Sequence, residues 1–363
     1  MSQTLILSPE AAVDTVPAGA ALNLYLAGVG AVGGALLDQI ESVSHPGIRL
    51  VGACTTRGSA FEPGGLTPAR VRNAVRSGAP PNWEAVVSAL PGPAVVVDAT
   101  GSLEVAGLYE RFFEAGHHIA TPSKLANTRT QERFDTLIGM ARQRGLFYRY
   151  EATVGAGLPV IRVVQDLLAT GDRVHAMQGV VSGTMTFLFG QVDAGVPLSV
   201  AVRDAVERGY AEPDPRDDLS GEDVVRKFMI LARTAGFRVE REEVTVESLV
   251  PPDLVHVSRD RFLDELPAYD ESWARLAAEA RARGERLRYV GRLRDGLIRV
   301  GVEAVPADSP MGLLRETDNL LQLTTDRYAT SPLTVQGPGA GPAVTASGVF
   351  ADILDIAARV TVR

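Results

Sequence analysis

Acidic residues and a lysine that could carry chemistry are concentrated in residues 209–235. Pro213 and Pro215 fix φ and lack N–H donors, so the first half of this stretch is predicted to be an irregular, kinked loop. The loop carries four carboxylates, which belong to Glu212, Asp214, Asp217 and Asp218. A helix is predicted to follow, with Ser220 as its N-cap and Gly236 as its stop.

Asp223 and Lys227 lie four residues apart on that predicted helix, which makes their side chains neighbours on one face. A lysine held at a substrate oxygen can donate or accept a proton, and an adjacent carboxylate can orient the lysine. The pair therefore predicts acid–base chemistry near the start of the helix. The alternative is an ordinary solvated ion pair that follows a polar loop.

A second stretch with chemical meaning is rich in glycine. Residues 22–27 predict a buried strand, residues 35–37 begin a helix, and between them lies a G-x-G-x-x-G turn. Such glycines permit a tight turn, close approach of the backbone to a pyrophosphate, and close packing of helix on strand. The turn predicts dinucleotide binding, whereas a purely structural turn is the alternative. Its residues are Gly28, Val29, Gly30, Ala31, Val32 and Gly33.

The strand predicted at 48–54 ends in Thr55-Thr56-Arg57, with no acid for a ribose 2′-hydroxyl. An arginine can bind a 2′-phosphate, so NADP(H) is favoured while NAD(H) stays possible; Arg57 as a solvated loop residue is the alternative. Cys54 has no base implied nearby and is interpreted as an apolar strand residue. The buried strand at 94–98 leads into a small-residue turn at Thr100, which is predicted to pass under the cofactor.

Composition limits the class of protein. The chain has 363 residues, 45% of them hydrophobic and 22% charged, which is typical of a globular protein with room for two domains. A net charge of −8 disfavours nucleic acid or an anionic membrane as the main partner. A single cysteine suits a reducing cytoplasm. The uncharged stretch after Asp14 is rejected as a membrane span because it holds Pro17 and many glycines.

The string GY-x-EPDPRDDLSG-x-DV-x-RK at 209–227 closely resembles the signature of homoserine dehydrogenases. Further similarities follow in order over 22–363. The resemblance implies conversion of L-aspartate 4-semialdehyde to L-homoserine with NADPH, in threonine, methionine and isoleucine biosynthesis. It implies an α/β fold with a Rossmann-type dinucleotide-binding domain, residues 1–150 plus 335–363, and an α+β substrate and dimerisation domain, residues 151–334, whose sheet builds a homodimer. A chain of this length is expected to carry no further regulatory module.

Site residues follow from the same resemblance. Lys227 matches the acid/base, Asp223 its partner, and Lys124, in a T-P-S-K turn, a lysine that touches cofactor and substrate. The implied substrate contacts are Tyr210, Glu212, Asp218, Gly183 and Thr184, and Gly341 is implied to contact the cofactor. A sodium ion is implied on the main-chain oxygens of Glu151, Val154, Ala156 and Leu158, where a plain tight turn is the alternative. Ser123 and Ser182 replace the family's asparagines.

Other patterns predict structure. Residues 287–293 and 297–305 predict a hairpin around Asp295-Gly296, and the last helix has an apolar stripe that includes Val349. His117 and His118 are interpreted as surface residues. Two other functions stay open, namely a different small-amino-acid dehydrogenase on the same fold, and a non-catalytic NADP-binding sensor. A sensor need not retain Lys124, Glu212, Asp223 and Lys227 together.

Overall fold

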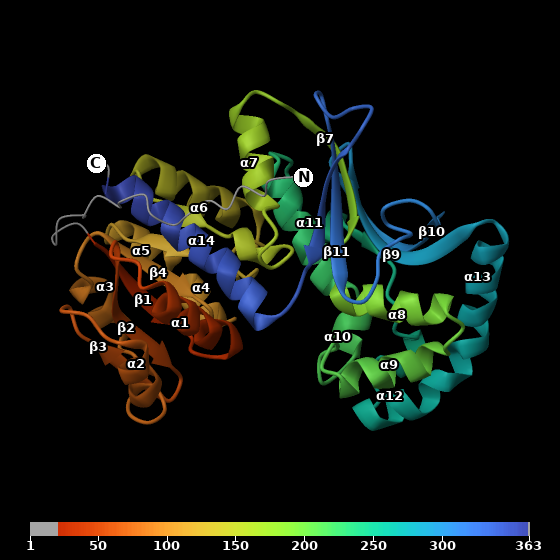
Figure 1. Ribbon diagram of the computed structural model, residues 1–363, viewed down its shortest axis with the longest axis horizontal. Coiled ribbons are helices and arrows are strands. Elements are labelled where there is room, and N and C mark those ends of the chain that lie inside the picture. Colours follow the sequence, from red (N-terminus) through yellow and green to blue (C-terminus); the bar gives the residue numbers. More distant parts are fainter. Residues whose placement is uncertain (1–20, 362–363) are drawn as a thin grey trace, which may run out of the picture.

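The computed structural model describes residues 21–361, so residues 1–20, where the sequence predicts an extension with a possible short strand, and residues 362–363 lie outside the described part. Figure 1 shows two halves side by side, each built around one sheet, with the long C-terminal helix lying against the first half. No helix within the described residues is long and apolar enough to cross a bilayer.

The first sheet has six strands in the order β3-β2-β1-β4-β5-β6. Its strands are β1 Leu22–Ala27, β2 Ile48–Thr55, β3 Gly58–Phe61, β4 Ala94–Asp98, β5 His118–Ala120 and β6 Tyr148–Arg149. All neighbours are parallel except β2 and β3, which form an antiparallel hairpin that the sequence analysis did not predict. The crossover helices are α1 Ala31–Val43, α2 Pro68–Ala74, α3 Trp83–Ala89, α4 Leu103–Gly107, α5 Tyr109–Glu114 and α6 Gln131–Gln143.

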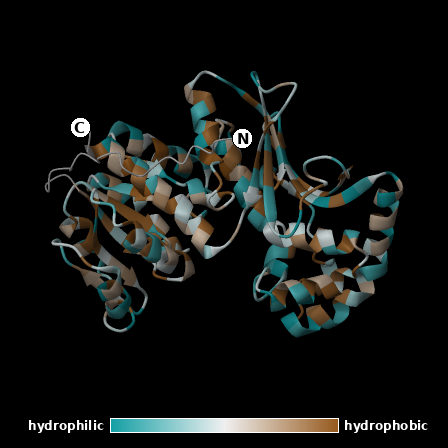
Figure 2. Cartoon of the chain, in the orientation of Figure 1, coloured by the Kyte–Doolittle hydropathy of each residue, from teal (hydrophilic) through white to brown (hydrophobic). Residues whose placement is uncertain are grey.

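Both faces of the first sheet are covered. Leu24 and Leu26 of β1 point to a core shared with α1 and the last helix, whereas Tyr25 points to the opposite core, where Phe112 of α5 lies. This alternation follows from the two-residue repeat of a strand. Figure 2 shows hydrophobic residues concentrated along these strands, as expected for a sheet buried on both faces.

The second sheet has the order β12-β11-β7-β9-β10-β8 and is mainly antiparallel. Its strands are β7 Val174–Val180, β8 Thr245–Val246, β9 Glu285–Arg294, β10 Leu297–Pro306, β11 Asp318–Thr325 and β12 Leu333–Pro338. The predicted hairpin is confirmed as β9 and β10, with Asp295 and Gly296 both at positive φ. The helices of this half are α7 Ile161–Ala169, α8 Gly183–Asp193, α9 Leu198–Glu207, α10 Arg216–Leu219, α11 Glu222–Thr234, α12 Arg259–Glu265 and α13 Asp270–Ala282.

Helix α14, Pro342–Thr361, packs against α1 in the first half, and Val349 of its predicted stripe is buried there. The strand before it, β12, pairs with β11 in the second sheet and contains residue 335, where the sequence places a domain boundary. The division at 150/151 and 334/335 stays a prediction.

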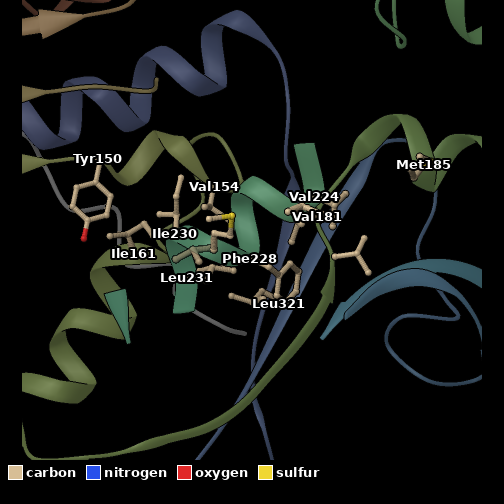
Figure 3. Close-up of a cluster of buried hydrophobic side chains, with 14 of the residues drawn as sticks. Tyr150, Val154, Ile161, Val181, Met185, Val224, Phe228, Ile230, Leu231 and Leu321 are labelled. Carbon is tan, nitrogen blue, oxygen red and sulfur yellow. The ribbon is translucent and has the colours of Figure 1, made fainter. Parts of the chain in front are cut away.

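Helix α11 lies between the two halves (Figure 1) and is buried along most of its length. Figure 3 shows Phe228, Ile230 and Leu231 of this helix among apolar side chains of other elements, including Val154. A Cβ on Gly291 of β9 would lie 2.1 Å from the Phe228 ring, so only glycine leaves room for this helix against the sheet. Helix α11 is therefore a rigid part of the core.

The interpretation of His117 and His118 as surface residues is wrong. Both are buried: the Nε2 atom of His117 lies 3.2 Å from the Val87 carbonyl oxygen, and Nδ1 of His118 accepts from the Phe147 amide. Burial lowers the pKa of His117. The short strand β5 begins at His118, and its burial on both faces overrides the polarity of the side chains.

Candidate active site

A cleft of about 1230 Å³ lies at the carboxyl ends of β4 and β5 and receives residues from both halves. The starts of α1, α8, α11 and α14 all contribute to its lining, and helix starts attract anions because their first N–H groups lack intrahelical acceptors. The predicted residues that line it are Val32, Lys124, Ala156, Gly183, Thr184, Tyr210, Glu212, Asp218, Asp223, Lys227 and Gly341.

The glycine turn has the close backbone approaches that its sequence predicts, but α1 begins at Ala31 and not at residue 35, so Gly33 lies inside the helix. Gly28 adopts φ +95°, and a Cβ there would lie 2.7 Å from the backbone of Ala99. A Cβ on Gly33 would lie 1.9 Å from the Gly28 carbonyl oxygen, whereas Gly30 faces open space and directly precedes α1. The backbone can thus approach a phosphate at Gly30 while the helix packs closely on the turn.

Two lysines meet one carboxylate in the cleft. The Nζ atom of Lys227 lies 2.8 Å from Oδ2 of Asp223 and donates to the Val181 carbonyl oxygen at 2.6 Å. The Nζ atom of Lys124, from the turn after β5, lies 3.2 Å from Oδ1 of Asp223. Burial raises the pKa of the Asp223 carboxyl, but the ammonium groups of Lys227 and Lys124 outweigh burial and hold this pKa below its ordinary value.

One compositional signal for these lysines was missed. The chain contains 36 lysines and arginines, and Lys124 and Lys227 are the only lysines among them. A guanidinium stays protonated in proteins, whereas an ammonium can release its proton. The two lysines of the chain are thus the two basic side chains that contact Asp223 in the cleft.

The loop before α11 differs from the prediction. Residues Arg216–Leu219 form the short helix α10, and the N-cap of α11 is Gly221 at φ +77°, not Ser220. The Ser220 hydroxyl still accepts from the Glu222 amide at 3.3 Å. A left-handed residue is needed to turn the chain between two successive helices, and glycine adopts that conformation without strain.

The four loop carboxylates are not equivalent. Asp214 pairs with Arg216 and does not line the cleft, whereas Glu212, Asp217 and Asp218 do. Oδ2 of Asp218 accepts from the Glu212 amide at 2.8 Å. Burial raises the pKa of Asp218, and the carboxylates of Glu212 and Asp223 raise it further. This part of the cleft is strongly negative and suits a cationic group of a ligand.

The predicted turn at Gly183 and Thr184 is the first turn of α8, with Ser182 as its N-cap. The Thr184 hydroxyl donates to the Tyr210 carbonyl oxygen at 2.6 Å, and the Tyr210 ring packs edge-on against Phe187 at the rim. A Cβ on Gly183 would lie 2.9 Å from the Thr317 carbonyl oxygen. Thr317 also lines the cleft, and sequence reasoning missed it because no local pattern marks it.

A buried network supports the first-half turns. Asp98 accepts from the Thr100 hydroxyl at 2.6 Å and from the Tyr109 hydroxyl at 2.7 Å, and its carbonyl accepts from Thr121. Burial raises the pKa of Tyr109 well above its ordinary value. The Thr100 hydroxyl is thus committed to Asp98, and its neighbours Ala99 and Gly101 line the cleft instead. Asp98 ends an apolar strand, which is the signal that could have identified it.

Arg57 lies in the turn between β2 and β3, is exposed, and is not among the residues that line the cleft. Its amide donates to the Thr55 hydroxyl at 3.1 Å, which orders the turn. The side chain is free to approach a group bound beside the end of β2.

The predicted sodium loop combines a 3-10 helix at Glu151–Thr153 with positive φ at Gly155 and Ala156. The Glu151 carboxylate accepts from the amides of Val160, Ile161 and Arg162 at 2.6, 2.7 and 2.8 Å, which caps α7. Burial raises the pKa of Glu151. Because that side chain is occupied, a cation would depend on carbonyl oxygens, and a curled loop with neutral carbonyls fits a hard monovalent ion. Within 21–361 no cluster of His, Cys, Asp and Glu could hold a metal.

A Rossmann-type sheet with its glycine turn, facing two lysines and a carboxylate in one cleft, defines a dinucleotide-dependent oxidoreductase. Family models described as homoserine dehydrogenase and as homoserine dehydrogenase, NAD binding domain, match residues 159–354 and 28–151. The chain belongs to the homoserine dehydrogenase family.

The similarity to individual proteins supports the same family. The chain is 37% identical to a homoserine dehydrogenase of Paracoccidioides brasiliensis, over 94% of this chain and 99% of that protein. It is 38% identical to a bifunctional aspartokinase/homoserine dehydrogenase of Haemophilus influenzae over 92% of this chain, which spans only 42% of that relative's length. A crystal structure of a Candida auris protein of unknown function superposes with a TM-score of 0.88, at 34% identity, and covers 94% of this chain and 99% of that one.

Proposed function

We propose that this chain catalyses the reversible interconversion of L-aspartate 4-semialdehyde and L-homoserine with NADP(H). The observation that carries the proposal is the joint placement of Lys227, Lys124 and Asp223 in one cleft, between a nucleotide turn and a cluster of acids. The reaction belongs to threonine, methionine and isoleucine biosynthesis. A cytoplasmic location suits the single, buried cysteine.

Each charged end of the substrate has a suitable partner. The carboxylates of Glu212 and Asp218 suit the α-amino group, and the first N–H groups of α8, at Gly183 and Thr184, suit the α-carboxylate. Lys227 gives a proton to the carbonyl oxygen in reduction and takes it back in oxidation. The nicotinamide supplies or accepts the hydride when bound. Lys124 contacts both the substrate and the cofactor.

The direct test is NADPH absorbance at 340 nm in the presence of aspartate 4-semialdehyde. We expect oxidation of NADPH that depends on the semialdehyde, and the reverse reaction with homoserine. Oxidation with other small aldehydes but not this one would favour a different amino-acid dehydrogenase. Binding of NADPH with no turnover of either substrate would favour the sensor instead.

The preference for NADP(H) is a proposal that rests on Arg57 and on the missing acid at the end of β2. A solved archaeal homoserine dehydrogenase with the same fold, at a TM-score of 0.73, is described as a complex with NADPH. Arg57→Ala should weaken NADPH binding by about 1.5–3 kcal/mol and leave NADH nearly unaffected, because a charge-assisted contact to the 2′-phosphate is lost. Calorimetric titration of both cofactors measures this. Equal losses for both cofactors contradict the role.

The sodium site is a proposal supported by the curled loop at 151–158. Sodium should raise the melting temperature relative to a bulky organic cation at equal ionic strength. A ligand at 100 times its Kd adds about 2.7 kcal/mol to the free energy of unfolding. Identical melting curves in both salts would argue for a plain turn.

A homodimer through the second sheet is also proposed. Gln178 and Arg292 lie side by side on β7 and β9, and Gln178 donates to Gln322 of β11 at 2.9 Å. Met177 and Leu293 on the other face are buried in the core. A polar face of this kind can pair with a second copy. Light scattering should give twice the chain mass of 38.6 kDa; a monomer at micromolar concentration contradicts the dimer.

A further inference from the structure

Arg233 is a buried cation in the last turn of α11, and its side chain has no exposed surface. Its guanidinium donates to carbonyl oxygens outside the helix: to Asn127 at 2.8 Å, to Arg129 at 2.7 Å and to Val239 at 2.7 Å. Glu240 supplies the carboxylate partner at 3.2 Å. Burying a guanidinium is costly unless its donors are satisfied, so this side chain holds two separate backbone segments at fixed positions.

The first of these segments carries Lys124. The amides of Asn127 and Thr128 both donate to the Lys124 carbonyl oxygen at 3.1 Å, so Lys124 belongs to the compact turn that Arg233 grips. Arg233 also lies on the same rigid helix as Lys227, six residues further along, or about 9 Å of helix. The helix thus carries one lysine itself and holds the backbone of the other.

The segment at 239–240 is also hydrogen-bonded directly to the segment at 127–131. Oε1 of Glu240 accepts from the Gln131 amide at 2.9 Å, and the Val239 amide donates to Oε1 of Gln131 at 3.1 Å. Arg233 therefore closes a clasp, defined here as Arg233, Val239 and Glu240 bonded to residues 127–131. The clasp joins the part of the chain after β5 to the catalytic helix.

We propose that Arg233 is a positioning residue, which fixes the Lys124 turn against α11 and so sets how Lys124 and Lys227 meet at Asp223. The inference rests on the proposed function for its kinetic consequence, but not for its structural one. Arg233 does not line the cleft and acts through the turn. No lysine can replace it, because an ammonium cannot reach the carbonyls of Asn127, Arg129 and Val239 together.

The matched control is Arg288→Lys. Arg288 is also fully buried and donates to carbonyl oxygens, those of Met311 at 3.0 Å and Gly312 at 2.8 Å, with Asp193 as its carboxylate partner. It lies in the second sheet, and its hydrogen bonds go to Asp193, Leu287, Met311 and Gly312, outside the Lys124 turn. Both variants lose a similar buried network, so a general loss of stability affects them alike.

The first measurement is amide hydrogen exchange followed by mass spectrometry. Arg233→Lys should speed exchange in peptides that cover 124–131, whereas Arg288→Lys should leave those peptides protected. If Arg233→Lys does not fold, Glu240→Gln weakens the same clasp and should give the same local pattern. Unchanged protection of 124–131 in a folded clasp variant overturns the proposal, whether or not the chain turns over aspartate 4-semialdehyde.

The second measurement is a double-mutant cycle on kcat. Arg233→Lys should lower kcat about 10–100-fold, since a misplaced catalytic group costs that much. In a Lys124→Ala background the same substitution should cost only about twofold, because its target is gone. Fully additive losses mean that Arg233 does not act through Lys124. If the wild-type chain shows no turnover, the proposed function is rejected. Hydrogen exchange then remains the test of whether Arg233 fixes the Lys124 turn.

Discussion

The two lysines of the cleft are the same side chain under different constraints. Lys227 extends from a buried helix, is 11% exposed, and bonds both Asp223 and the Val181 carbonyl oxygen. Lys124 extends from a turn and is 27% exposed, and among residues 21–361 its ammonium bonds only Asp223. An ammonium has three N–H donors, so Lys227 has one left for a ligand and Lys124 has two.

That difference separates their roles. A single remaining donor, aimed by a rigid helix, suits transfer of one proton at one oxygen. Two remaining donors on a turn suit contact with two molecules, which are the cofactor and the substrate in the proposed reaction. The exclusive use of lysine at these positions in an otherwise arginine-based chain is consistent with both roles, because a guanidinium cannot release a proton and is larger.

The largest expected effect comes from Lys227. Lys227→Ala should lower kcat about 10²–10⁴-fold with NADPH binding near normal, since acid–base help is lost. Lys227→Arg keeps the charge but should lose a similar factor, because the proton cannot leave. Steady-state rates over pH in both directions measure this. Retention of more than about a tenth of kcat by Lys227→Ala, or an unchanged high-pH limb for homoserine oxidation, would transfer the acid–base role to Lys124.

A smaller and different effect is expected at Lys124. Lys124→Ala should raise KM for cofactor or substrate and lower kcat together, by about 10–100-fold in kcat/KM, as the loss of a charged contact predicts. Fluorescence titration with NADPH and initial rates separate the two. If only kcat falls while both KM values stay constant, Lys124 acts on the chemical step and not on binding.

The smallest effect concerns the shared carboxylate and stability. The pKa of Asp223 is lower in the folded chain than in the unfolded one, so its ionised form stabilises the fold above about pH 4 and this contribution is lost as pH falls further. Asp223→Asn should reduce the free energy of unfolding by about 1 kcal/mol at pH 7, and by less at pH 3. Urea titrations at both pH values measure this. Asp264→Asn, at an exposed ion pair with Arg203, is the control and should change little.

An equal loss at pH 3 and pH 7 for Asp223→Asn would show that packing, not the two ammonium groups, accounts for the contribution of this side chain. The lysines would then be held by their own backbone positions. They would differ only in that Lys227 extends from a helix and Lys124 from a turn.

Local patterns sufficed where neighbours in sequence make the structure. The spacing of Asp223 and Lys227, the glycines of the nucleotide turn and the Asp295-Gly296 hairpin depend on helix period, positive φ and turn type, and all three are present as predicted. Local patterns failed where packing decides. Pro215 did not prevent α10, because it stands at the N-cap, where no intrahelical N–H is needed.

Only the tertiary structure decided which distant groups meet. Lys124 reaches Asp223 because the turn after β5 is bonded to α11, and Val181 offers its carbonyl to Lys227 because β7 has ended just before α8. The burial of Arg233 follows from the same packing. Residue type and spacing specify each element and its polar face. They do not specify which carbonyl or carboxylate another element presents, because that depends on how the two sheets and α11 pack against one another in the close-packed interior.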